Sequence, residues 1–256
     1  MTALLLYRPN RQAGELQKSV FLKKTKIKTG FFKPAPKTTA LAIQYFLFFG
    51  VLGILLPFFN LYCYRLGFSG FQIGILSSMQ TGAAVIFPLL WGALADRFDA
   101  RKPIYVLCNT ASAALWSLLL LTTGFYPMLV IVLFYSIFRA PVISFLEAFS
   151  MDILGSKKKS YGTVRAWGTI SFIATVITVG RLTDTISIRI IVPLIFAGML
   201  VQSLCSLALP SLKGRPREAG IAKIVRQKHV AVFLLCGFIM LVSHGAYYGF
   251  FSIHLE

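Results

Sequence analysis

Three charged residues stand inside long apolar runs of this 256-residue chain, where a charge is unusual: Arg139, Glu147 and Arg165. An arginine fork binds a carboxylate through two parallel hydrogen bonds and binds hydroxyl groups singly. A carboxylate accepts hydroxyl groups or takes up a proton. These residue types predict a binding site for a polar or anionic group of a small organic solute. The alternative is an ion pair that only fixes the packing of two helices.

The spacing of Glu147 and Arg165 allows the two side chains to meet. Ser156, in the polar segment between their apolar runs, is nine residues from each of them. If the runs are antiparallel helices that rise about 1.5 Å per residue, both charges lie at the same depth. Arg139 precedes Glu147 by eight residues, which places it about 80° away around one helix. We therefore expect Arg139 to line the same cavity, unless it anchors the end of a neighbouring helix.

Pro141 lies between Arg139 and Glu147 and can loosen their helix. A proline leaves one backbone carbonyl without its helical partner, so protein or cavity water must supply a donor. Trp167 follows Arg165 by two residues, and we predict that it forms an apolar wall of the cavity or an interfacial anchor. His244 is a candidate to bind solute or carry a proton, or to make a packing hydrogen bond.

The elements that must position these residues are membrane helices. Residues of the AVILMFWYC set make up 57% of the chain and charged residues only 13%, against about a quarter charged in soluble domains. A bilayer-spanning helix needs about 20 mainly apolar residues, and seven stretches qualify. They are Ala40–Tyr64, Phe71–Leu94, Pro103–Thr123, Pro127–Ile153, Thr163–Arg181, Ile188–Leu209 and Ala231–Ile253.

Lysine and arginine collect in alternate connections, which predicts the orientation of the chain. The segment before the first span carries nine of them, and the second-to-third, fourth-to-fifth and sixth-to-seventh connections carry three, three and six. The other connections hold only Arg65, Arg181 and Arg189. Because cytoplasmic segments are the basic ones, we expect a cytoplasmic amino terminus. This distribution explains the net charge of +18 without nucleic acid as a partner, although the basic arm is suited to anionic lipid heads.

The predicted fold is an all-α polytopic membrane protein, made of a six-helix bundle and a seventh transmembrane helix. Residues 1–38 form a basic cytoplasmic arm and residues 39–210 the six-helix domain. Residues 211–228 read as a basic cytoplasmic linker, and residues 229–256 as the first helix of an incomplete second domain.

The connection between the second and third spans reads GALADRFDARK from Gly92 to Lys102. It resembles the signature loop of the major facilitator superfamily, G-x-L-x-D-R-x-G-R-R-K, and departs from it at Asp99 and Ala100. The resemblance implies a latch between two six-helix halves, whereas the alternative is an ordinary basic inner loop. The gating residues that it implies are Gly92, Asp96, Arg97, Arg101 and Lys102. Gly92 would let two helices approach closely, and Asp96 would face the positive end of a neighbouring helix.

Four further motifs carry a closer resemblance: RAP at 139–141, LEAF at 146–149, YGTVRAWG at 161–168 and SHGAYYGF at 243–250. They resemble the 3-phenylpropionic acid transporter group and its relatives. The pair Glu147 and Arg165, 18 residues apart, is similar to the sugar-binding acid and arginine of lactose permease. The resemblance implies a twelve-span carrier that binds its solute between two rocking halves, with nearly half of that fold missing here.

These observations predict a secondary active transporter in the cell (inner) membrane. The expected solute is an aromatic acid, a sugar or a nucleoside, with proton symport as the expected coupling. Phosphate-cradle, HExxH and GxSxG motifs are absent from the sequence, so we expect neither an enzyme nor a bound cofactor or metal. We expect that this chain alone does not transport, because its partner half-transporter domain is missing. The alternative is a non-transporting membrane protein, such as a sensor or an assembly factor with this fold.

Overall fold

The computed structural model describes residues 36–155, 160–210, 227–232, 235–237 and 239–240, and this part of the chain is helical throughout, with short connections. Its elements are α2 (Pro36–Arg65), α3 (Gly70–Arg97), α4 (Arg101–Ser117), η1 (Leu118–Leu120), α5 (Phe125–Arg139), α6 (Pro141–Leu154), α7 (Tyr161–Thr185), η3 (Ile188–Ile190) and α8 (Ile191–Ser206).

The first six predicted spans are confirmed as helices long and apolar enough to cross a membrane. Their observed bounds are Thr38–Arg65, Gly70–Arg97, Arg101–Leu120, Phe125–Leu154, Tyr161–Thr185 and Ile188–Ser206. Most of the predicted seventh span lies outside the described residues. Within it, residues 231–232, 235–237 and 239–240 are helical, and its role as a span stays a prediction, as do the boundaries of the arm and the linker.

Local chemistry sets the helix boundaries. Ser69 and Gln72 form a reciprocal cap at the start of α3: the Gln72 amide donates to the Ser69 hydroxyl at 3.3 Å, and the Ser69 amide donates to the Gln72 side chain at 2.9 Å. This arrangement satisfies backbone donors that the first turn of a helix leaves without partners. At the other end of α3, Asp99 adopts φ +48° in the turn to α4. This left-handed conformation favours glycine, the residue of the signature loop at this position.

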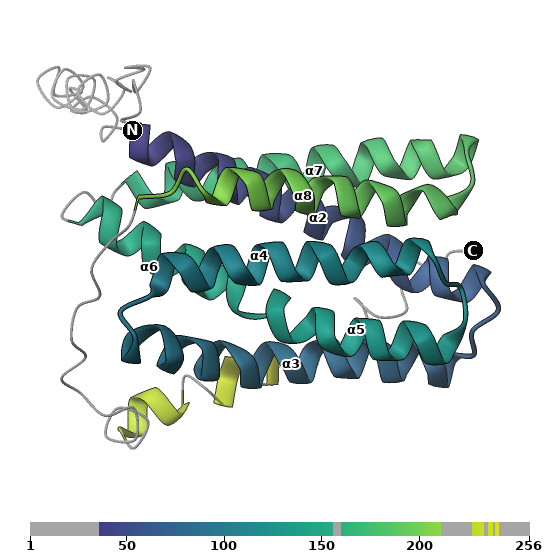
Figure 1. Cartoon of the computed structure of the whole chain (residues 1–256), viewed down its shortest axis with the longest axis horizontal. Helices are drawn as coiled ribbons and strands as arrows, with labels where there is room; N and C mark the ends of the chain where they lie inside the picture. Colours follow the sequence, from purple (N-terminus) through teal and green to yellow (C-terminus); the bar gives the residue numbers. More distant parts are fainter. Residues whose placement is uncertain (1–35, 156–159, 211–226, 233–234, 238, 241–256) are drawn as a thin grey trace, which may run out of the picture. The chain divides into compact units, whose positions relative to one another are not determined.

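The fourth span consists of two helices rather than one. α5 ends at Arg139 and α6 begins at Pro141, and Figure 1 shows α6 leaving the axis of α5 at this point. Pro141 lacks the amide that would bond the carbonyl of Ile137 four residues earlier. The indole Nε1 of Trp91, on α3, donates to that carbonyl at 3.0 Å. Protein therefore supplies the donor that the sequence required.

The helices pack in a bundle whose central members are α2 and α4. α2 packs along α7 and α8, while α4 packs against α5 and α8. α3 lies along α5, and α6 contacts α2, α3 and α4. In Figure 1, α7, α2 and α8 lie along the upper edge, α4 in the middle and α3 and α5 along the lower edge.

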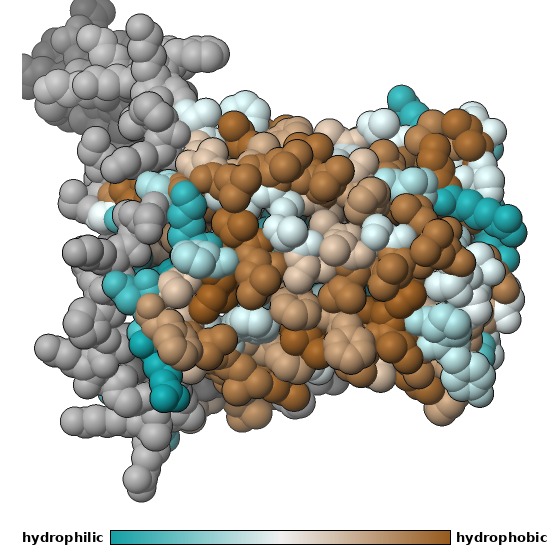
Figure 2. All heavy atoms as spheres, in the orientation of Figure 1, coloured by the Kyte–Doolittle hydropathy of each residue, from teal (hydrophilic) through white to brown (hydrophobic). Residues whose placement is uncertain are grey.

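Apolar side chains fill the bundle in two clusters and also cover its outside. One cluster surrounds Trp116, and the other surrounds Tyr105 and Leu146. Figure 2 shows a face that is hydrophobic across its middle, with hydrophilic residues gathered at the two ends. This distribution is the one a bilayer requires, because its hydrocarbon layer is about 30 Å thick and takes no exposed polar groups.

Glycines allow α2 and α7 to approach closely. A Cβ atom on Gly53 would lie 3.0 Å from the carbonyl oxygen and 3.3 Å from the Cα of Phe172, both backbone atoms of α7. Small residues at such contacts are typical of membrane helix pairs. The backbone of α7 cannot move away without separating the two helices.

We predict that Trp91→Phe lowers the free energy of unfolding by about 1–3 kcal/mol, because it leaves the partly buried Ile137 carbonyl without a donor. In a Pro141→Ala background the cost is smaller, since the alanine amide supplies the hydrogen bond. Thermal unfolding of the four purified variants in detergent measures this coupling. Equal costs in both backgrounds would show that the indole does not replace the proline's missing amide.

We predict that Gly53→Leu destabilises the chain by about 1–3 kcal/mol through overpacking against α7. Gly82→Leu on α3 is the matched control, because no atom within 4 Å meets a Cβ placed there. The unfolding midpoint falls for the first variant only. Similar midpoints for both would contradict the close contact of α2 with α7.

Candidate functional site

Glu147 on α6 and Arg165 on α7 lie together, as their spacing from Ser156 predicted. The Nε atom of Arg165 is 3.8 Å from Oε1 of Glu147, and their side chains are 31% and 33% exposed. The two charges thus form a loose and partly exposed pair. Neither is sealed in the bundle.

Two tyrosines lie on the Glu147 side of this pair. The hydroxyl group of Tyr161 donates to Oε2 of Glu147 at 2.6 Å. The hydroxyl group of Tyr45, on α2, bonds that of Ser150 at 2.9 Å, one turn after Glu147. Our sequence reasoning missed Tyr161, although it precedes Arg165 by four residues and so lies on the same face of α7.

Two aromatic rings of α2 contact Arg165. The guanidinium carbon of Arg165 lies 3.8 Å from the ring centre of Phe49 and 5.6 Å from that of Tyr45. Phe49 is 116 positions from Arg165 in the sequence. No local pattern relates the two residues, so only the packing of α2 on α7 reveals this contact.

Arg139 lies in the interior of the bundle. It is 9% exposed, its Nη1 donates to Oε1 of Gln202 on α8 at 2.9 Å, and its guanidinium carbon lies 4.4 Å from the ring centre of Phe48. Glu147, in contrast, is one-third exposed. A cavity shared by Arg139 and Glu147, and a part for Arg139 in solute binding, stay predictions.

Two candidates remain. Trp167 is 49% exposed, and a separation of two residues on α7 turns it about 160° away from Arg165. Whether it forms a cavity wall or an interfacial anchor stays a prediction. His244 lies outside the described residues, so its role stays a prediction.

The loop from Gly92 to Lys102 joins helices through Arg101, the first residue of α4. Its guanidinium group contacts Asp96 at 2.8 Å and Asp152, near the end of α6, at 3.2 Å. Lys102 donates to the carbonyl of Leu207, just after α8, at 2.9 Å. The sequence reasoning missed Asp152, although one of only eight acidic residues in a basic inner segment was a signal for a charge partner.

Two loop residues make weaker contacts than predicted. Among the described residues, Arg97 contacts only the ring of its neighbour Phe98, with its guanidinium carbon 5.9 Å from the ring centre. A Cβ atom on Gly92 would meet nothing within 4 Å. Gly92 thus meets no other helix among the described residues, and the close helix approach expected there stays a prediction. The gating role of the loop stays a prediction.

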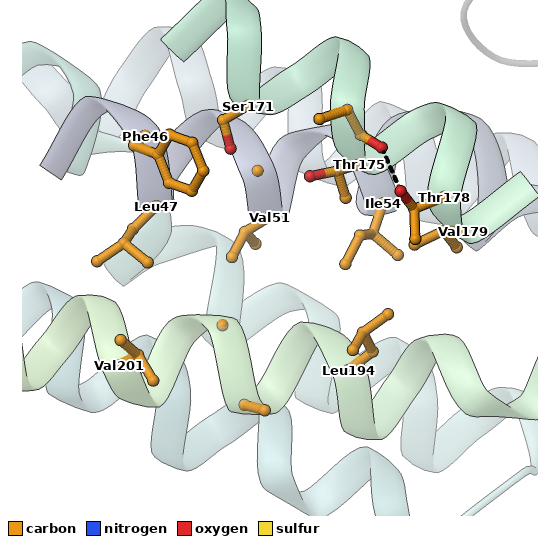
Figure 3. Close-up of a pocket in the computed structure, with 14 residues that line it drawn as sticks. Phe46, Leu47, Val51, Ile54, Ser171, Thr175, Thr178, Val179, Leu194 and Val201 are labelled. Atoms are coloured by element: carbon orange, nitrogen blue, oxygen red, sulfur yellow. Dashed lines mark hydrogen bonds between the residues drawn. The ribbon is translucent and has the colours of Figure 1, made fainter. Parts of the chain in front are cut away.

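A separate groove of about 460 Å³ lies between α7 and α8, with α2 as its floor. Figure 3 shows Phe46, Val51 and Ile54 of α2 facing this groove, with Leu194 and Val201 of α8 opposite α7. Its polar lining is limited to hydroxyl groups of α7. One of them, that of Thr178, donates to the carbonyl of Ala174 in its own helix at 2.8 Å. Neither Glu147 nor Arg165 lines this groove.

The chain is similar to several bacterial carriers. It is 26% identical over 227 residues to maltose permease of Geobacillus stearothermophilus, and the aligned region covers 84% of this chain and 57% of that protein. It is 26% identical over 233 residues to the protein named Probable 3-phenylpropionic acid transporter of Escherichia coli (strain K12), with 86% and 59% covered. The chain thus spans little more than half the length of these relatives.

The fold also matches a solved structure. A crystal structure of a mutant of the nucleoside transporter NupG superposes with a TM-score of 0.72 at 23% identity, over 83% of this chain and 56% of that one. The model of the MFS_1 like family matches residues 38–256. Since this match takes in all six described spans and most of the sequence, the chain is a multi-pass membrane protein that belongs to the MFS_1 like family.

Proposed function

We propose that this chain forms the solute-binding amino-terminal half of a secondary transporter for a small organic solute. The observation that carries the proposal is the loose Glu147–Arg165 pair, one-third exposed within two membrane spans. A charge that faces hydrocarbon is costly, and ionisable groups in spans normally face a cavity or a partner. The pair is therefore suited to a wet crevice.

Arg165 is the proposed solute-binding group. Among the described residues it has ring contacts and one ion pair at 3.8 Å, with no hydrogen bond to its guanidinium group. Its donors are thus available for a carboxylate or for hydroxyl groups. Glu147, already bonded to Tyr161, accepts solute hydroxyl groups or a proton. The relatives are named for a disaccharide, an aromatic acid and nucleosides, and all three classes carry such groups.

A second membrane domain is the proposed partner. The windows of α3 and α7 are only 17% and 22% buried in the bundle, against 39–44% for the other four spans. Two apolar helices with so little cover suit an apposed helical half, and this chain spans only 57% and 59% of two of its relatives. We further propose the inner membrane, a cytoplasmic amino terminus and proton coupling, on the distribution of lysine and arginine and the carboxyl group of Glu147.

We predict that the chain alone takes up no solute, whereas its in-frame fusion to the second half of the E. coli relative does. Uptake of radiolabelled 3-phenylpropionate, maltose and uridine is measured in cells that lack their own carriers for these solutes, with and without a protonophore. An inserted fusion that takes up none of the three contradicts the proposal. Accumulation by the chain alone in proteoliposomes contradicts the need for a second half.

We predict that Arg165→Lys in this fusion lowers uptake about tenfold or more, because lysine lacks the two-pronged geometry. Arg181→Lys is the matched control, since Arg181 is an exposed arginine near the other end of α7. Membrane insertion of both variants is verified by immunoblot. Undiminished uptake by Arg165→Lys would exclude a binding role for this residue.

A further inference from the structure

We infer that Phe49 and Gly168 are positioning residues for Arg165, the ring as a platform and the glycine as the space that lets the guanidinium group lie on it. This inference rests on the proposed solute-binding role of Arg165. The ring contact, 3.8 Å from the guanidinium carbon to the ring centre, falls within the range of about 6 Å in which a cation is attracted to an aromatic face.

The carboxylate of Glu147 makes an ion pair with Arg165 but no direct hydrogen bond. Its Oε1 lies 3.8 Å from Nε of Arg165, beyond the 2.7–3.2 Å typical of such a hydrogen bond. Its other oxygen accepts the hydroxyl group of Tyr161 at 2.6 Å. Among the described residues, the ring of Phe49 lies closest over the guanidinium group of Arg165, at 3.8 Å against 5.6 Å for the ring of Tyr45.

Gly168 makes this contact possible. It follows Arg165 by three residues, so both lie on the face of α7 that packs against α2. A Cβ atom at this position would lie 2.6 Å from Cδ2 of Phe49 and 3.1 Å from Nη1 of Arg165. Any larger side chain therefore displaces the ring, the guanidinium group or both. A glycine inside a helix is otherwise unfavourable.

The consequence for binding is that Arg165 is preorganised while its donors stay free. A ring face attracts the cation without using any N–H group, whereas a hydrogen-bonded carboxylate would occupy one or two of them. A solute can then bond the arginine without first displacing Glu147. Arg139 and Phe48 differ in this respect. Arg139 also lies on a ring, that of Phe48, but its Nη1 donates to Gln202.

The first test needs no solute. The purified chain is treated with phenylglyoxal, and labelling of Arg165 relative to Arg181 is measured by peptide mass spectrometry. Phe49→Leu and Gly168→Ala are expected to raise this ratio about threefold or more, because the guanidinium group loses its cover. Phe49→Tyr keeps the ring and the ratio, and Phe46→Leu, which alters an exposed phenylalanine of the groove, is the control. An unchanged ratio in Phe49→Leu, in a chain with the parental unfolding midpoint, overturns the inference.

The second test measures uptake kinetics of the fusion with 3-phenylpropionate, maltose and uridine. Phe49→Leu is expected to raise KM by roughly 3- to 30-fold, the range of a cation–ring contact, with kcat within twofold. Phe49→Tyr restores the parental KM. Raised labelling with an unchanged KM overturns the positioning role. If the parent fusion takes up none of the solutes, the proposed function fails, and labelling still decides whether the ring holds Arg165.

Discussion

Two arginines inside membrane spans impose the main constraint on this structure, because a guanidinium group cannot be left facing hydrocarbon. Both arginines contact α2, through the consecutive residues Phe48 and Phe49. Their rings contact each other edge to face, with centres 5.1 Å apart, and each receives one arginine. Since neighbouring positions on a helix point about 100° apart, one cation lies inside the bundle and the other at its open side. The central place of α2 between α7 and α8 makes this division possible.

Arg139 and Glu147 lie on one span but have different surroundings. Arg139 is bonded to Gln202 in the interior, whereas Glu147 reaches Arg165 at a partly exposed position. Pro141 between them leaves one carbonyl without its backbone donor, and Trp91 satisfies it from α3. An indole is well suited to this task, because it buries a large apolar surface and carries a single donor.

Charge at the basic end of the bundle ties together helices that are distant in sequence. Arg101 links the end of α3 to the end of α6 through Asp96 and Asp152, and Lys102 reaches the end of α8. These contacts engage the side of the loop that faces its own bundle, while a Cβ atom on Gly92 of α3 would meet nothing within 4 Å.

The sequence by itself determined the class of the protein, six of the spans and the meeting of Glu147 with Arg165. Hydrophobic length specifies spans because each helix must cross the same bilayer, and a hairpin with arms of equal length brings its partners to one depth. Tertiary structure alone decided that Phe49 contacts Arg165, that Asp152 pairs with Arg101, and that Arg139 bonds Gln202 in the interior. All three are contacts between different helices. Periodicity along one helix carries no information about them, because it describes which residues share a face and not what that face meets.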